Sequence, residues 1–262
     1  MRLLSAEALV LDVVDLQERD RIATFLTREY GKKRGVAQGA RRKYSRFAGQ
    51  LQPLAKVQLE WFEKDNRDLA RLRDVSLIRP AHKLQADLEG NLLGSYLADH
   101  MLEFAQEGES SENLYRLLDT SIESLLSGAD RDLVARYFEV WVLRLQGIFP
   151  APRDCPICGR AFSGLGDRGR PGALLPNDGD ALICLDCAGG EGARGSTVGT
   201  EVLEFLRRTG REGIAQLAET ATREGTLREV EGLTAKLRRR FLGHELRSYD
   251  VIRQAQRTAG PA

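Results

Sequence analysis

The sequence lacks any long apolar run. No uninterrupted hydrophobic stretch approaches the roughly 18 residues that a membrane-spanning helix needs. The first twenty residues carry seven charged side chains, so they contain no apolar segment of the kind that a secretory signal requires. We therefore expect a soluble, cytoplasmic protein with no membrane partner.

The sequence also lacks the signatures of common cofactor-dependent enzymes. It contains no Walker A loop and no H-E-x-x-H segment, and it has only three histidines. The run GLGDRG at residues 164–169 matches the dinucleotide-binding fingerprint. Its flanks, RAFS and RPGALLP, predict neither the preceding strand nor the following helix that such a site needs. We predict that the chain is not an enzyme.

Net charge is nearly absent, at +1, but the charges are unevenly distributed. Residues 28–46 hold eight lysines and arginines and one glutamate, whereas residues 81–150 hold five basic and twelve acidic residues. The near-neutral total therefore conceals a basic amino-terminal region and an acidic middle region.

The first eighty residues have the pattern of short strands. Residues 54–62 alternate between apolar and polar side chains, and residues 8–14 and 21–27 are rich in apolar and β-branched residues. With residues 33–40 and a return strand at 69–78, the pattern gives about five strands, enough for a small barrel. Pro80 closes this region.

From Ala81 the apolar period becomes helical, with three stripes before Gly147 and Pro150 interrupt it. The stripes are Leu84, Leu88, Leu92, Tyr96 and His100; Leu114, Leu117, Leu118, Ile122 and Leu125; and Leu133, Tyr137, Phe138, Trp141, Val142 and Leu145. Helix signals resume near residues 198–208. A capping box from Thr226 to Glu229 predicts one last helix that continues through Leu246.

All four cysteines lie in a glycine- and proline-rich segment and form the pattern C-x₂-C-x₂₅-C-x₂-C: Cys155, Cys158, Cys184 and Cys187. Two such pairs complete a tetrahedral sulfur shell, which predicts one structural Zn²⁺; a redox dithiol and an iron–sulfur cluster are the alternatives. Four protein ligands leave no position for a reactive water, so we expect a site without catalysis.

The basic run YGKKRGVAQGARRKYSRFAG (30–49) contains no acidic residue. Its glycines allow backbone to approach a phosphate closely, and exposed rings of Tyr44 and Phe47 would stack on bases. Cations and aromatic platforms on a five-stranded barrel are how oligonucleotide-binding folds hold single strands. A solvated loop, an anionic membrane and an acidic protein partner are the alternatives, and Phe47 fits the core equally well.

Taken together, the segments resemble a known family. The stretch EALVLDVVDLQERDRIATFLTREYGKKRGVAQGARRKYSRFAGQLQP resembles the amino-terminal part of the RecO family of bacterial recombination mediators. The resemblance rests on Glu18, on Asp20 and Arg21 before a strand, on TREYGK, and on GAR followed by a basic segment. It continues to GIFPAPRDCPICGR and LICLDC, which match the zinc-bearing members of the family.

This resemblance implies an α+β chain. An oligonucleotide-binding (OB-fold) barrel at 1–80 is followed by an all-helical domain at 81–150 and 196–255, with a four-cysteine zinc module inserted at 151–195. It implies binding to single- and double-stranded DNA, annealing of complementary strands, and action with RecR to load RecA on DNA coated with single-strand-binding protein (SSB). It also implies work in the bacterial cytoplasm at the nucleoid.

By position, the residues expected to contact DNA are Arg28, Lys32, Lys33, Arg34, Arg41, Arg42, Lys43 and Arg46, with Arg19 and Arg21 as weaker candidates. The resemblance further implies that the helical domain binds the acidic tail of SSB. The cations available for such a pocket are Lys83, Arg131, Arg136 and Arg144, or Lys236, Arg238, Arg239 and Arg240. The rival functions are a zinc-ribbon enzyme that processes nucleic acid and a scaffold that docks an acidic protein.

Overall fold

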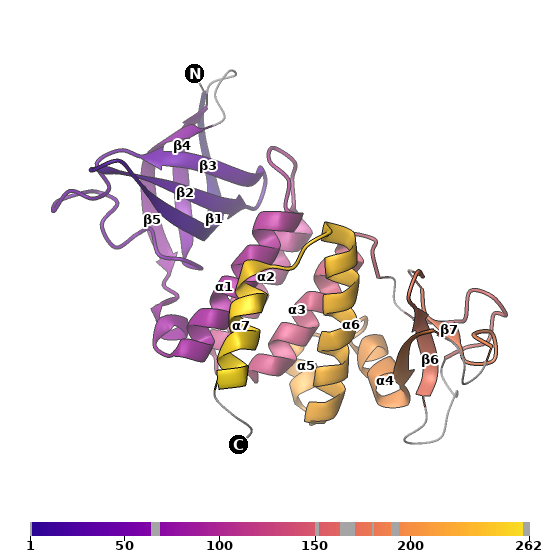
Figure 1. Cartoon of the computed structure of the whole chain (residues 1–262). Helices are drawn as coiled ribbons and strands as arrows, with labels where there is room; N and C mark the ends of the chain where they lie inside the picture. The colour runs from indigo at the N-terminus through magenta and orange to yellow at the C-terminus, as the bar shows by residue number, and fades with distance from the viewer. Residues whose placement is uncertain are drawn as a thin grey trace. The chain divides into compact units, whose positions relative to one another are not determined.

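The computed structural model describes residues 2–63, 69–149, 152–162, 171–179, 181–189 and 194–258. The chain divides into two compact units, and Figure 1 labels helices and strands of both. The first is Met1–Gly128 with Leu246–Ala262, and the second is Ala129–Glu245. The sequence predicts domain boundaries at residues 80, 150 and 195, and these stay predictions. The two compact units meet along the chain at other positions, after Gly128 and after Glu245.

The amino-terminal barrel is formed by five strands. They are β1 (Arg2–Leu16), β2 (Asp20–Thr27), β3 (Gly31–Ala37), β4 (Lys56–Glu63) and β5 (Ala70–Arg79). The strands close in the order β1-β2-β3-β5-β4, and β3 and β5 meet in a short parallel contact. This is the predicted oligonucleotide-binding barrel, and the structure confirms it.

Apolar side chains at alternate positions of the strands fill the barrel interior. Alternate residues of β4 point inward, so that Val57, Leu59 and Trp61 are buried. Phe47, from the connection between β3 and β4, joins the same core at 2% exposure. Its ring is therefore part of the core and is not a stacking platform for bases.

Three helices and a short 3₁₀ segment complete the first unit: η1 (His82–Gln85), α1 (Leu88–Phe104), α2 (Glu112–Leu126) and α7 (Arg247–Thr258). The Asp87 side chain caps α1 by accepting a hydrogen bond from the Gly90 N–H. Tyr96 stacks on Tyr249, and the Asp99 carboxylate accepts a hydrogen bond from the Ser248 N–H. The last helix of the chain thus packs on α1.

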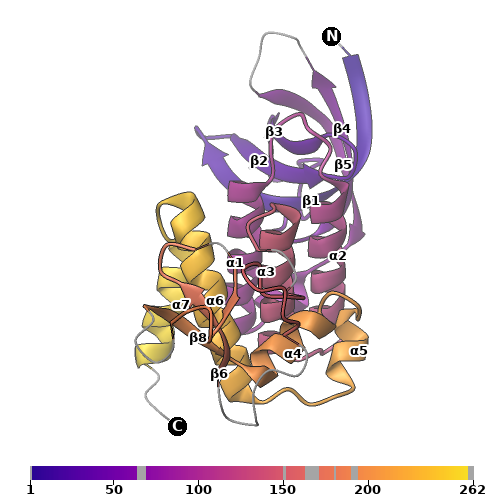
Figure 2. The same cartoon turned by 90° about the vertical axis from the view of Figure 1, so that its right-hand side faces the viewer.

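The second unit combines helices with a small sheet (Figure 2). Its elements are α3 (Arg131–Leu145), β6 (Pro171–Pro176), β7 (Ile183–Cys184), β8 (Gly195–Gly199), α4 (Thr200–Arg208), α5 (Ile214–Ala218) and α6 (Glu224–Leu242). The strand order is β7-β6-β8, and both α4 and α6 pack beside this layer. None of the helices that the structure describes is both long and apolar enough to cross a membrane.

The predicted start and end of the last helix are wrong. The helix begins at Glu224, so Thr226 lies in its first turn, and its hydroxyl donates to the Glu201 carboxylate instead of capping the helix. The helix ends at Leu242 because Gly243 adopts a left-handed conformation with φ of +78°. A separate helix, α7, follows.

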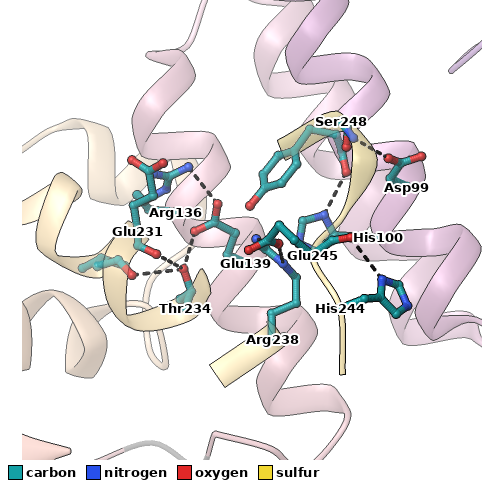
Figure 3. Close-up of polar contacts among 12 residues, drawn as sticks. Asp99, His100, Arg136, Glu139, Glu231, Thr234, Arg238, His244, Glu245 and Ser248 are labelled. Atoms are coloured by element: carbon teal, nitrogen blue, oxygen red, sulfur yellow. Dashed lines mark hydrogen bonds and ion pairs between the residues drawn. The ribbon is translucent and has the colours of Figure 1, made fainter. Parts of the chain in front are cut away.

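Buried charges join α3 to α6 (Figure 3). Arg136 pairs with Glu139 and Glu231 at 2.7 Å each, and Glu139 also accepts a hydrogen bond from the Thr234 hydroxyl at 2.6 Å. Arg136 and Glu139 are 6% and 1% exposed. Because a buried charge left without a partner is costly, this network fixes how the two helices pack.

Two arginines that the sequence offered for the SSB tail are therefore engaged internally. Arg136 belongs to the network just described, and Arg238, at 1% exposure, pairs with Glu245 at 2.5 Å. Arg240 and Lys236 hold the turn after β6: Arg240 donates to the carbonyls of 177–179, and Lys236 to the Asn177 side chain.

Candidate nucleic-acid interface and metal centre

The eight cations predicted to contact DNA differ in their surroundings. They lie on the β2–β3 turn, on β3, and on the connection between β3 and β4. Some are held by other parts of the first unit, and others are exposed without a carboxylate partner among the described residues. The structure thus separates them into two groups.

Lys32 anchors β3 to the end of α1. Its Nζ donates to the Leu102 carbonyl at 2.5 Å, and its backbone N–H donates to the Gln106 carbonyl at 3.0 Å. The preceding residue, Gly31, has φ of +63°, and a Cβ there would lie 1.9 Å from the Glu109 carbonyl oxygen. Lys32 is therefore part of a tight internal contact.

Lys33 and Arg28 are paired with carboxylates. Lys33 lies opposite Phe25 in the β2–β3 register and shares its inward direction, and its Nζ lies 2.6 Å from a Glu63 oxygen. Arg28 donates to Glu112 at 3.2 Å, and this hydrogen bond raises the pKa of the guanidinium. Both pairs reduce the charge available to a phosphate.

Arg41 is bound to the β1–β2 turn. Its guanidinium donates to the Gln17 carbonyl at 3.1 Å and lies 3.5 Å from Asp15, which also pairs with Arg21 at 3.0 Å. Arg21, a weaker candidate, is thus paired with Asp15 and not with its neighbour Asp20.

The remaining candidates form an exposed basic group. Arg42, Lys43 and Arg46 are exposed on residues 38–49, which we call the basic loop, and Tyr44 beside them is 89% exposed. Lys43 lies over the Tyr44 ring and Arg46 over the Phe47 ring. Within the described ranges, none of these three cations has a carboxylate partner.

Arg34 is also exposed, but it lies on the outer face of β3, opposite Thr24 of β2. The structure describes no ion pair for it. Arg34 is therefore available to a partner, although it does not belong to the basic loop.

Sequence reasoning missed a polar cluster that joins the barrel to α2. Lys56 of β4 lies 3.0 Å from Asp119 and 3.3 Å from Glu7, and Arg79 also binds Asp119. Burial raises the pKa of the nearby Tyr115 to about 12. In the sequence, Lys56 occupies a polar position of an alternating strand and is therefore expected to face solvent. The helix that covers it, α2, lies far away along the chain, so the sequence pattern does not reveal the contact.

The four cysteines meet as predicted. The sulfur atoms of Cys155, Cys158, Cys184 and Cys187 all lie within 4.8 Å of one another, and those of Cys158 and Cys184 are 3.7 Å apart. Four sulfurs bound to one ion at 2.3 Å would be about 3.8 Å apart in a tetrahedron. A disulfide would need about 2.05 Å. The arrangement fits four ligands around one metal ion.

Local backbone positions the first pair. Gly159, with φ of +72°, turns the chain after Cys158, and its N–H donates to the Cys155 carbonyl at 2.8 Å. The Cys184 N–H points at the Cys155 sulfur at 3.4 Å. The second pair begins at Cys184, the last residue of β7, and the register with β6 places Cys184 opposite Ala173.

The electrostatics of the cluster also suit a cation. Burial opposes ionisation of Cys155, but the backbone N–H groups of Cys184, Cys158 and Ile157 outweigh this and lower the pKa of Cys155 to about 6. Hydrogen bonding with the other thiols raises the pKa of Cys187 to about 12. Four adjacent thiolates repel one another, and a bound cation removes that repulsion.

The prediction that GLGDRG is not a nucleotide site falls on residues 163–170, which lie outside the described residues. Of the arginines near the cysteines, Arg160 pairs with Asp186, and Arg153 is exposed.

Comparison with known proteins agrees with this architecture. Residues 1–81 match the family model described as Recombination protein O N terminal, and residues 85–250 match Recombination protein O C terminal. The chain belongs to the RecO family. RecO relatives include the DNA repair protein RecO of Geobacter metallireducens, 32% identical, with 84% of this chain and 87% of that protein aligned.

Two further RecO relatives are similar along most of their length. The DNA repair protein RecO of Anaeromyxobacter sp. strain Fw109-5 is 32% identical, with 93% of each chain aligned. That of Anaeromyxobacter sp. strain K is 34% identical, with 90% of this chain and 89% of the relative aligned. Membership of RecO places the chain among DNA repair proteins and confirms the prediction that it is not an enzyme.

Proposed function

We propose that the chain is a recombination mediator that binds single- and double-stranded DNA and anneals complementary strands. The observation that carries this proposal is the basic loop, in which Arg42, Lys43 and Arg46 are exposed, unopposed by described carboxylates, and adjacent to the exposed Tyr44 ring. Arg34 is a further candidate contact. Arg28, Lys32, Lys33 and Arg41 would contribute less, because their charges are already engaged.

The proposed mechanism is electrostatic and breaks no bond. Cations on the loop neutralise phosphates of one strand and reduce its repulsion of a second, so that complementary bases have time to pair. The Tyr44 ring would stack on an unpaired base, and because every base has a π-face, such a contact favours no particular sequence.

A charge-neutralised loop tests the proposal. Each phosphate contact contributes about −0.7 to the slope of log affinity against log salt for single strands. Replacing Arg42, Lys43 and Arg46 with alanine should therefore flatten the slope for oligo-dT by about 2 and abolish annealing of SSB-coated strands. Fluorescence anisotropy over a salt series measures the first effect, and a strand-annealing assay the second.

The matched control removes the same charge elsewhere. Arg116, Arg211 and Arg228 are exposed helix or turn residues that do not belong to the basic loop, and their triple alanine variant should keep the parent slope. If both triple variants flatten the salt slope equally, the affinity for oligo-dT depends only on the net charge of the protein. Unchanged binding in the loop variant would leave the protein-docking scaffold as the better reading.

The partners and the metal belong to the same proposal. We propose that the chain acts with RecR and the SSB tail to help RecA load, in the bacterial cytoplasm at the nucleoid, as the family resemblance implies. We also propose that the four cysteines hold one structural Zn²⁺. An all-thiolate shell with near-tetrahedral spacing supports zinc and leaves no site for a catalytic water.

A further inference from the structure

A short hydrogen bond attaches the basic loop to the start of β2. The Gly39 N–H donates to the Asp20 Oδ1 at 2.7 Å. Gly39 has φ of +71°, a left-handed conformation that redirects the chain immediately before the exposed cations. Asp20 is the first residue of β2 and is half-buried, so its side chain is held by the barrel.

Further contacts in the same place hold the loop. The Arg41 N–H donates to the Arg19 carbonyl at 3.1 Å, and the Arg41 side chain reaches Gln17 and Asp15. Beyond Arg41 the loop is made of successive turns, in which the N–H groups of Arg42 and Ser45 bond to carbonyls three residues earlier. The loop returns to the barrel core at Phe47.

We propose that Asp20 is a positioning residue for DNA binding, which holds the basic loop in the conformation that presents Arg42, Lys43 and Arg46 together. This inference rests on the proposed role of the loop. An acidic side chain beside a phosphate-binding surface would by itself weaken binding, through repulsion. Asp20 strengthens binding, because an ordered loop loses less conformational freedom when DNA binds.

Repulsion by the Asp20 charge would lower the affinity for DNA, whereas ordering of the loop by Asp20 raises it. These opposite effects make the inference testable. Asp20→Asn removes the charge but keeps an oxygen where the Gly39 N–H needs an acceptor. Asp20→Glu keeps the charge but moves the carboxylate by one methylene. Positioning predicts that Asp20→Glu lowers oligo-dT affinity about fivefold to tenfold, whereas Asp20→Asn matches or exceeds the parent. Simple repulsion predicts no change for Asp20→Glu and tighter binding for Asp20→Asn.

Glu18 provides the matched control. It is exposed on the same turn, and the described residues include no hydrogen-bond or ion-pair partner for it. Glu18→Gln should bind DNA at least as tightly as the parent. Hydrogen exchange of the Gly39 amide gives a second readout: it should be faster in Asp20→Glu than in Asp20→Asn, while thermal unfolding of the two variants should be similar.

The possible outcomes separate the inference from the proposed function. If Asp20→Glu binds as the parent does while the triple loop variant loses affinity, the loop binds DNA and Asp20 does not position it. If the triple loop variant also binds as the parent does, the proposed function itself fails. A loss in Asp20→Asn as large as that in Asp20→Glu would likewise overturn the inference.

Discussion

Gly31 is the position where the barrel approaches the α1–α2 connection most closely among the described glycines, and Gly31→Ala is the sharpest test of that packing. A Cβ at this position would lie 1.9 Å from the Glu109 carbonyl oxygen and 2.7 Å from that of Gln106. Cβ atoms essentially never come within 3.0 Å of such an atom, so the connection must move by about 1 Å.

The cost has three parts. An alanine in the left-handed region loses about 1–2 kcal/mol. Forced displacement of packed backbone costs about 1–3 kcal/mol. Loss of the hydrogen bond from the Lys32 N–H to Gln106 adds about 1 kcal/mol. We expect Gly31→Ala to lower the free energy of unfolding by about 3–6 kcal/mol in total.

Gly49→Ala is the control, because it imposes the same backbone strain without the contact. Gly49 has φ of +72°, and nothing lies within 4 Å of its added Cβ. It should lose only the conformational part, so Gly31→Ala should melt about 5–10 °C below Gly49→Ala. Thermal unfolding followed by circular dichroism measures the difference. Melting temperatures within about 2 °C of each other would refute the close packing described here.

Two further predictions concern the metal and the paired cations. Cys184→Ser should reduce bound zinc from one equivalent to none, measured by elemental analysis, and lower the melting temperature, because metal binding contributes directly to folding. Its DNA affinity at a temperature where the variant is folded should stay within about twofold of the parent; selective loss of DNA binding would contradict a structural metal. Lys33→Met should leave the salt slope for oligo-dT unchanged to within about 0.3, because the lysine already pairs with Glu63. Glu63→Gln is its control, and a slope flattened by about 0.7 in Lys33→Met alone would return Lys33 to the DNA surface.

The barrel and the cysteine cluster could be predicted because their signals are local. Alternation from residues 54 to 62 defines one strand by itself, and two C-x₂-C pairs carry their own ligand geometry. The three-stranded sheet of the second unit was missed. Its strands are short, and β6 contains two prolines and a glycine, so no periodic pattern could be recognised.

Charge in a sequence does not reveal which cations are engaged. Lys33 lies two residues from Gly35 and four from Ala37, both of which face the barrel core, so its inward direction could have been read from the strand period. The sequence could not have predicted the contact of Lys32 with α1 or that of Arg28 with α2. Their partners are 70 and 84 residues away, and long-range packing alone brings them together.

The return of α7 to the first unit has a consequence for biosynthesis. The ribosome releases all of the second unit, Ala129–Glu245, before it releases the helix that packs against Tyr96. The second unit can therefore finish folding first, because the unit that carries the basic loop also needs α7, which is synthesised after it. Nascent chains stalled before Arg247 would leave the apolar side of α1 uncovered, as a target for chaperones.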